Sequence, residues 1–181
     1  AFSVARQAQC SWADTPHALR RSIFHRFHAL VLKHRELLMD MVQLETGKNR
    51  AAAFDEVMDV ASTAHYYART AEKLLRPKRR QGTIPGLSST WEHHYPLGVV
   101  GQISPWNYPL TLAISDAVPA LLAGNAVVSK PDSKTAFTSL LVTSLLYDAG
   151  LPPELFQTVT GEGAVVGGEI TELCDYLMFT G

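Results

Sequence analysis

Polar and glycine residues that can do chemistry gather in the second half of the chain. Each set directly follows a short apolar run. The sets are Ser104-Pro105-Trp106-Asn107, Lys130-Pro131-Asp132-Ser133, Thr160-Gly161-Glu162-Gly163 and Thr180-Gly181. Amides, ammonium groups, hydroxyls and glycine N–H groups can hold a phosphate, a ribose or a developing oxyanion. These four sets are therefore the first places to look for a site.

Each of these residues has a chemical and a structural interpretation. The side-chain amide of Asn107 can donate to an oxyanion, or it can cap a following helix, which is the commoner role of Asn at such a place. Lys130 follows an apolar run, where its cation can hold a phosphate or ribose or can lie at the surface. Gly161 and Gly163 precede a helical pattern, where backbone N–H groups can face an anion. The residues alone leave these alternatives open.

Other catalytic and metal-binding patterns are missing from the sequence. His25 and His28 share a helix face, but no Cys, carboxylate or third His at useful spacing completes a metal site. Cys10 and Cys174 match neither a disulfide framework nor a ligand pattern. A Gly-x-Ser-x-Gly turn and a Walker loop are also missing. We therefore predict no metal site.

Alternating elements must position the four polar sets. Short apolar runs predict strands at 99–103, 126–129, 155–159 and 176–179. Helical patterns lie between them at 110–122, 135–148 and 164–172. Strand–helix repetition of this length indicates a parallel sheet with helices on its faces. Because ligands bind beyond the carboxyl ends of such strands, all four sets should share one edge.

The first half of the chain is helical. Apolar residues at helical spacing predict a helix over 15–44, with Pro16 at its first helical position, and an Ala-rich helix over 51–75. A basic linker at 76–80 and extended strands over 82–95, with a turn at Pro85-Gly86, follow them. The predicted fold is α/β: an N-terminal helical hairpin and a β-hairpin, then a truncated Rossmann-like parallel sheet.

Charge divides the chain in the same place. Residues 1–95 hold 14 Lys and Arg against 9 Asp and Glu, whereas residues 96–181 hold 2 against 8. We place a boundary near Tyr95. The composition, 46% hydrophobic and 18% charged, is globular. The net charge of −1 gives no field to attract nucleic acid. No apolar run reaches the length of a membrane span, and the sparse cysteines favour a cytoplasmic location.

Five segments resemble the aldehyde dehydrogenase superfamily. They are ETGK at 45–48, PLGVVGQISPWNYP at 96–109, PALLAGNAVVSKP at 119–131, AGLPP at 149–153 and FTG at 179–181. They occur in the family's order, and the resemblance extends over essentially the whole chain. The resemblance implies that residues 1–95 form helices and oligomerisation-type strands. It implies that residues 96–181 form a partial nicotinamide-dinucleotide-binding domain, and that the catalytic domain is absent.

The resemblance also implies roles for single residues. Asn107 would be the catalytic residue that donates to the oxyanion. Lys130 would bind the adenosine ribose, and Gly161 and Gly163 would lie near the adenine. The full set of implied cofactor-binding residues is Ile103, Ser104, Pro105, Trp106, Asn107, Lys130, Asp132, Ser133, Gly161 and Gly163.

The resemblance bears on the cofactor and the reaction. NAD-preferring members often carry Glu at the position of Ser133, where a carboxylate repels a 2′-phosphate; Ser favours NADP, or use of both NADP and NAD. The pattern is most similar to the succinate-semialdehyde dehydrogenase branch, so the substrate would be a small aldehyde and the parent enzyme a homo-oligomer. The family's Cys nucleophile and Glu base match no residue here. We therefore expect no turnover from this chain alone. The alternative is a non-catalytic, truncated or decayed gene product that retains a cofactor-binding fold.

Overall fold

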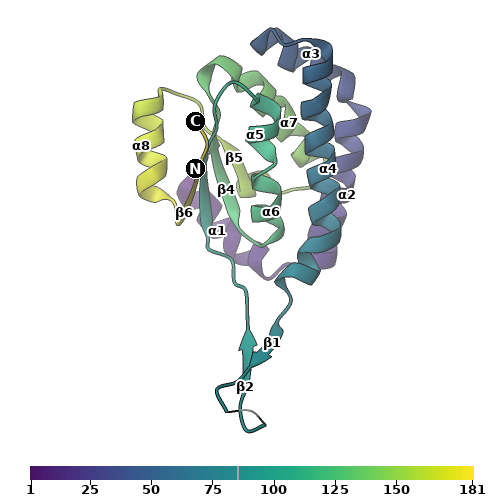
Figure 1. Ribbon diagram of the computed structural model, residues 1–181. Helices are drawn as coiled ribbons and strands as arrows, with labels where there is room; N and C mark the ends of the chain where they lie inside the picture. Colours follow the sequence, from purple (N-terminus) through teal and green to yellow (C-terminus); the bar gives the residue numbers. More distant parts are fainter. Residues whose placement is uncertain (85) are drawn as a thin grey trace.

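The computed structural model describes residues 1–84 and 86–181, in which helices cover a parallel sheet (Figure 1). The helices are α1 (Phe2–Ala13), α2 (His17–Lys33), α3 (Arg35–Thr46), α4 (Arg50–Leu75), α5 (Pro109–Ile114), α6 (Ala117–Leu122), α7 (Ala136–Asp148) and α8 (Gly163–Leu173). The strands are β1 (Lys78–Gln81), β2 (Ser89–Glu92), β3 (Val99–Ile103), β4 (Ala126–Lys130), β5 (Phe156–Thr158) and β6 (Tyr176–Phe179).

The central sheet has the strand order β5-β4-β3-β6, and every neighbouring pair is parallel. Ile103 lies opposite both Lys130 and Phe179, so the strands end level with one another. Helix α8 packs on β3 and β4 on one face, and α5, α6 and α7 cover the other (Figure 1). The predicted α/β fold with a parallel sheet is confirmed, and the polar sets do meet at one edge.

Helices α2, α3 and α4 form a layer outside α5, α6 and α7. Their buried faces join those of the sheet in one apolar core, which contains Phe24, Val57, Leu121 and Val127. The boundary predicted near residue 95 therefore crosses a continuous core, and it stays a prediction. No helix of the described residues is both long and apolar enough to span a membrane.

The N-terminal helices differ from the prediction in three ways. Helix α1 was not predicted, although its buried Trp12 donates from Nε1 to the Leu121 carbonyl at 2.8 Å. The helix predicted over 15–44 divides at His34, whose φ and ψ are −99° and 19°. On either side of this bend, α2 and α3 each pack against both α4 and α7. Pro16 is the N-cap of α2 rather than its first helical residue.

Three further predictions were wrong in detail. The helix predicted over 110–122 is two helices, because Pro119 has no N–H to donate back to Ser115 and its ring clashes with that turn. The basic linker at 76–80 contains the start of strand β1. Its cross-strand pairing with β2 places the Arg80 guanidinium 2.6 Å from the Glu92 carboxylate. The extended strands predicted over 82–95 were also misplaced, because β1 ends at Gln81, before that range, and β2 alone of the two lies within it. Helices α4, α7 and α8 and the strands of the parallel sheet match their predicted ranges to within one residue. Pro85 lies outside the described residues.

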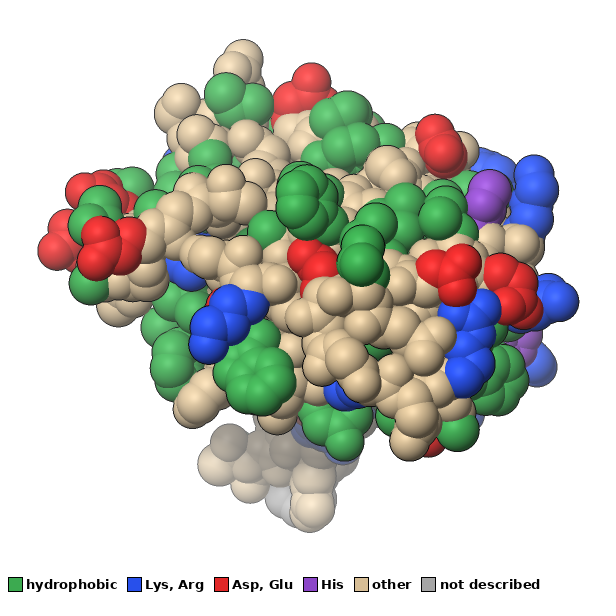
Figure 2. Space-filling view, turned by 90° about the horizontal axis from the view of Figure 1, so that it is seen from above, with side chains coloured by type: hydrophobic (Ala, Val, Ile, Leu, Met, Phe, Trp, Pro, Cys, Tyr) green, Lys and Arg blue, Asp and Glu red, His purple; other side chains and the backbone are tan. Residues whose placement is uncertain are grey.

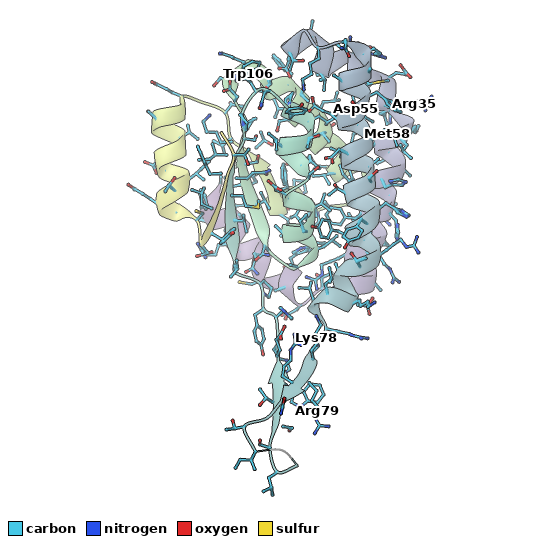
Figure 3. All side chains as sticks on the ribbon, in the orientation of Figure 1. Arg35, Asp55, Met58, Lys78, Arg79 and Trp106 are labelled. Carbon is cyan, nitrogen blue, oxygen red and sulfur yellow. The ribbon has the colours of Figure 1, made fainter. Side chains whose placement is uncertain are left out.

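The β1–β2 ribbon projects from the end of the molecule opposite the carboxyl edge of the sheet (Figure 1). Lys78 and Arg79 lie on this ribbon, whereas Trp106 lies at the other end (Figure 3). The molecule therefore separates an extended ribbon from the edge where the polar sets meet.

Candidate functional site

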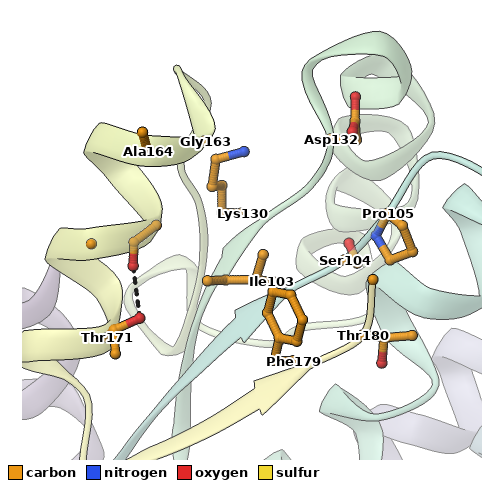
Figure 4. Close-up of a pocket in the computed structure, with 13 residues that line it drawn as sticks. Ile103, Ser104, Pro105, Lys130, Asp132, Gly163, Ala164, Thr171, Phe179 and Thr180 are labelled. Atoms are coloured by element: carbon orange, nitrogen blue, oxygen red, sulfur yellow. Dashed lines mark hydrogen bonds between the residues drawn. The ribbon is translucent and has the colours of Figure 1, made fainter.

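A cavity of about 490 Å³ opens at the carboxyl edge of the sheet, between α8 and the segments that follow β3 and β4 (Figure 4). Eight of the residues singled out in the sequence line it: Ile103, Ser104, Pro105, Lys130, Asp132, Gly163, Thr180 and Gly181. The other lining residues, which the sequence did not point to as a site, are Ala164, Gly167, Gly168, Thr171 and Phe179. Figure 2 shows the molecule from above, toward this edge, where uncharged side chains and backbone predominate.

Lys130 is the strongest chemical feature of the cavity. It ends the fully buried strand β4 and is 5% exposed, so its ammonium lies at the cavity wall rather than on the surface. Its Nζ donates to the Pro131 carbonyl at 3.2 Å, and among the described residues no carboxylate lies within ion-pair distance. A buried cation needs polar or anionic partners. The cavity therefore suits a ligand that carries hydroxyls or phosphate.

Ser104 and Asp132 add polar groups to the same wall. The Ser104 hydroxyl is buried and has no hydrogen-bond partner in the protein, so it is available to a ligand. The Asp132 carboxylate accepts from the Lys134 N–H at 2.9 Å and so caps the short 3-10 turn Ser133–Thr135. This cap fixes the turn that follows Lys130.

Glycines make the α8 side of the cavity flat. A Cβ added at Gly163 or Gly168 would meet nothing within 4 Å, and one at Gly167 would meet only the Ile103 side chain at 3.7 Å. A ring or sugar can therefore approach the helix backbone closely. No side chain caps the N-terminus of this 11-residue helix, so its first N–H groups are free to face an anion. The spacing of Ala164, Gly167, Gly168 and Thr171 was a sequence signal for this wall, because residues three and four apart share a helix face.

Asn107 lies in a neighbouring hollow of about 370 Å³, which is lined by Pro105, Trp106, Asn107, Leu112, Thr180 and Gly181. Pro105, Thr180 and Gly181 also line the larger cavity, so they separate the two spaces. Helix α5 has Tyr108 as its N-cap, and the Glu56 carboxylate accepts its early N–H groups. The helix-cap interpretation of Asn107 is therefore wrong. The exposed amide is left for another partner.

Ser133 and Gly161 lie at the rim, and neither lines the larger cavity. The Ser133 hydroxyl donates to the Gly161 carbonyl at 3.1 Å. This bond joins the segments that follow β4 and β5. Ser133 therefore stands where a group extending from the cavity toward α7 would pass.

The cysteines and histidines lie elsewhere. The exposed Cys10 thiol donates to the Arg6 carbonyl, and Cys174 packs beneath Gly101. His65 approaches His25 and His28, with ring centroids 6.1 and 5.1 Å away, a proximity that sequence spacing did not reveal. Within residues 1–84 and 86–181, no group of three or more His, Cys, Asp or Glu residues could hold a metal ion.

Comparison with known proteins gives this geometry a context. The family model for the aldehyde dehydrogenase family matches residues 1–181. The chain belongs to the aldehyde dehydrogenase family. It is 59% identical to a Mycolicibacterium smegmatis protein named "Putative succinate-semialdehyde dehydrogenase (NADP+)", over 100% of this chain and 35% of that protein. The chain thus spans about a third of the length of the curated relatives it matches.

Solved aldehyde dehydrogenase structures share the fold. An NAD-dependent benzaldehyde dehydrogenase from Corynebacterium glutamicum superposes with a TM-score of 0.84 at 34% identity, over 93% of this chain and 37% of that one. A betaine aldehyde dehydrogenase from Staphylococcus aureus, in complex with NAD+, gives 0.90 at 30% identity, over 98% and 36%. In this aldehyde dehydrogenase chain, the cavity beside Lys130 is the natural place to test for a dinucleotide.

Proposed function

We propose that this chain is the cofactor-binding part of an NADP- or NAD-dependent enzyme that oxidises a small aldehyde to its acid. The observation that carries the proposal is the buried Lys130 ammonium, which faces a glycine-walled cavity and has no carboxylate within ion-pair distance among the described residues. Lys130 and Ser104 would hold a ribose and its neighbouring phosphate. The open face of α8 would support the adenine end.

The two hollows would divide the reaction. The nicotinamide, when bound, supplies the hydride acceptor. On the other side of Pro105, the Asn107 amide would donate to the aldehyde oxygen as negative charge develops there, which stabilises the transition state. Ser133 would leave room for, and donate to, a 2′-phosphate, which favours NADP. Ile103, Trp106, Asp132, Gly161 and Gly163 would complete the cofactor's surroundings.

Substrate and assembly are proposed from the relatives and the ribbon. Succinate semialdehyde is the candidate aldehyde, because it appears in the name of the M. smegmatis relative. The β1–β2 ribbon would contribute to a homo-oligomer, because its Trp91 and Leu87 side chains are exposed. Cys10 and Cys174 line neither hollow, so these 181 residues alone would bind the cofactor without oxidising the aldehyde.

Isothermal titration of the 181-residue chain with NADP+ and with NAD+ tests the proposal. We expect Lys130→Met to weaken NADP+ binding by about tenfold or more, because a charge-assisted hydrogen bond is worth roughly 1.5–3 kcal/mol. The control is Lys73→Met, which removes an exposed lysine near the end of α4 and should leave the affinity unchanged. No detectable binding by the unaltered chain, or equal effects of the two substitutions, would overturn the proposal.

A further inference from the structure

A buried ion pair lies next to the turn that carries Asn107. The Glu56 carboxylate on α4 is 1% exposed, and one of its oxygens is 2.5 Å from Lys48 Nζ, whose side chain is 18% exposed. Gly47 ends α3 with a φ of 71°, a left-handed conformation that turns the chain so that Lys48 faces α4. Burying two charges is costly unless both find good partners. We therefore expect each of the two charged groups to have further polar or aromatic partners.

Both members of the pair contact the segment that follows Asn107. The second Glu56 oxygen accepts from the Leu110 N–H at 2.9 Å and from the Thr111 N–H at 3.2 Å. The Lys48 ammonium lies 3.9 Å from the centre of the Tyr108 ring, a cation–π contact. The residue directly after Asn107 and the first turn of α5 are thus held by one pair of charges.

The other end of the same segment is also fixed. Ser104 N–H donates to the Lys130 carbonyl at 3.1 Å, and the Gln102 amide donates to the Leu112 carbonyl at 2.7 Å. Between these anchors, Trp106 and Asn107 are exposed, and Lys134 Nζ lies 5.7 Å from the centre of the Trp106 ring. Their placement therefore depends on the two anchored ends.

We propose that Lys48 and Glu56 are positioning residues that fix the Tyr108 end of the turn and thereby aim the Asn107 amide into its hollow. The role of the Asn107 amide as a donor to the substrate rests on the proposed function, but its positioning can be tested without measuring turnover. A misplaced donor loses its effect steeply with distance. This gives a buried ion pair on α3 and α4 a function at the carboxyl edge of the sheet.

A second helix cap, Glu45, is a control that distinguishes positioning of the turn from a general loss of stability. The Glu45 carboxylate accepts from the Phe137 and Thr138 N–H groups at 2.9 and 2.7 Å, so it caps α7 as Glu56 caps α5. Glu45→Gln should lower the melting temperature in the same way as Glu56→Gln. It should leave the turn that carries Asn107 undisturbed.

The experiment is a ¹H–¹⁵N NMR comparison on the 181-residue chain, reading the Asn107 side-chain NH₂ and the Trp106 indole N–H, assigned with Asn107→Ala and Trp106→Phe. We expect Glu56→Gln and Lys48→Met to shift or broaden both signals, Lys48→Arg to restore them, and Glu45→Gln to leave them in place. Lys48 is partly exposed, so Lys48→Met decides the question if Glu56→Gln does not fold.

Two outcomes would overturn the inference: unchanged Asn107 and Trp106 signals in the folded Lys48→Met chain, or equal shifts in Glu45→Gln. NADP+ titration of the same samples separates this inference from the proposed function. A chain that binds no NADP+ contradicts the proposed function, while the NMR comparison still decides the role of the ion pair. If both hold, Lys48→Met should bind NADP+ within about threefold of the unaltered chain. The segment borders the cavity at Pro105 and at Ser104, whose N–H is held by the Lys130 carbonyl, whereas Trp106 and Asn107 do not line it.

Discussion

At the residue scale, the character of Ser133 depends on its place at the rim. Its hydroxyl donates to the Gly161 carbonyl, and its side chain is exposed where the segments after β4 and β5 meet. We expect Ser133→Glu to lower NADP+ affinity by about tenfold or more, since like charges at close range repel, and to leave NAD+ affinity within about twofold. Isothermal titration with both cofactors measures the ratio.

Ser133→Ala is the control for this prediction. It removes the hydroxyl without adding a charge, so the NADP+ to NAD+ preference should fall by less than in the Glu variant. If Ser133→Glu lowers both affinities equally, the 2′-phosphate does not lie near residue 133.

Asn107 shows what sequence reasoning can reach at this scale. Its position after a strand and before a helix made a helix cap the natural interpretation, because Asn is frequent there. The cap is in fact the Glu56 carboxylate, which reaches α5 from α4. Such a contact depends on tertiary packing and leaves no local signal. For Lys130, the apolar run before it predicted the end of a buried strand, but the residues alone did not decide between a cation that faces a ligand and one at the surface. Burial of the side chain decides this.

At the element scale, prediction succeeded where apolar periodicity and chain breakers agreed. Helix α4 and strands β3 and β6 carry both signals and were predicted within one residue. Helix α1 was missed because its buried face consists of small residues and Trp12, which give weak contrast. The division at His34 could not be predicted, because no Gly or Pro lies near it and the apolar spacing continues from α2 into α3. The division before Pro119 did have a breaker that was overlooked.

A glycine in helix α8 should affect the stability of the chain and its affinity for NADP+ in opposite directions. Gly168 lies in its interior, and a Cβ there would meet no atom within 4 Å but would project toward the cavity. We expect Gly168→Ala to stabilise the chain by about 0.5–1 kcal/mol through helix propensity, seen as a higher melting temperature by circular dichroism. NADP+ affinity should fall at least severalfold in titration. Glu172→Ala, exposed on the same helix, should leave the affinity unchanged; a loss there too would contradict this use of the α8 glycines.

The α2–α4 contact should make stability depend on pH. Burial, followed by the charges of His65, Arg21, His28 and Arg69, lowers the pKa of His25 below its ordinary value of 6.5. The folded chain therefore binds this proton less readily than the unfolded chain, so its stability falls as the pH drops below about 6.5. His25→Gln should flatten the fall in melting temperature between pH 8 and pH 5. Burial also lowers the pKa of His17, so part of the slope should remain. Parallel curves for the two proteins would show that His25 does not contribute.

At the scale of the whole molecule, the cavity and the sheet edge share strand β6. This strand pairs with β3 on one side and stands at the end of the sheet order, so its other edge has no strand partner among the described residues. Its Tyr176 and Phe179 side chains are 53% and 63% exposed. An unpaired edge with exposed aromatic side chains favours association with another strand. The 181-residue chain should therefore self-associate through the same strand that ends at the cavity.

Sedimentation velocity over a range of protein concentrations tests this expectation, with Tyr176→Lys as the variant. A lysine on an edge strand opposes pairing, so the mean sedimentation coefficient should fall toward that of a monomer at concentrations where the unaltered chain associates. Tyr66→Lys is the matched control, because Tyr66 is 55% exposed on α4, away from the sheet edge. A monomer at every concentration, or an equal effect of the two lysines, would mean that association does not occur through β6. If the two lysines have equal effects, the exposed Trp91 and Leu87 side chains of the β1–β2 ribbon are the next surface to test.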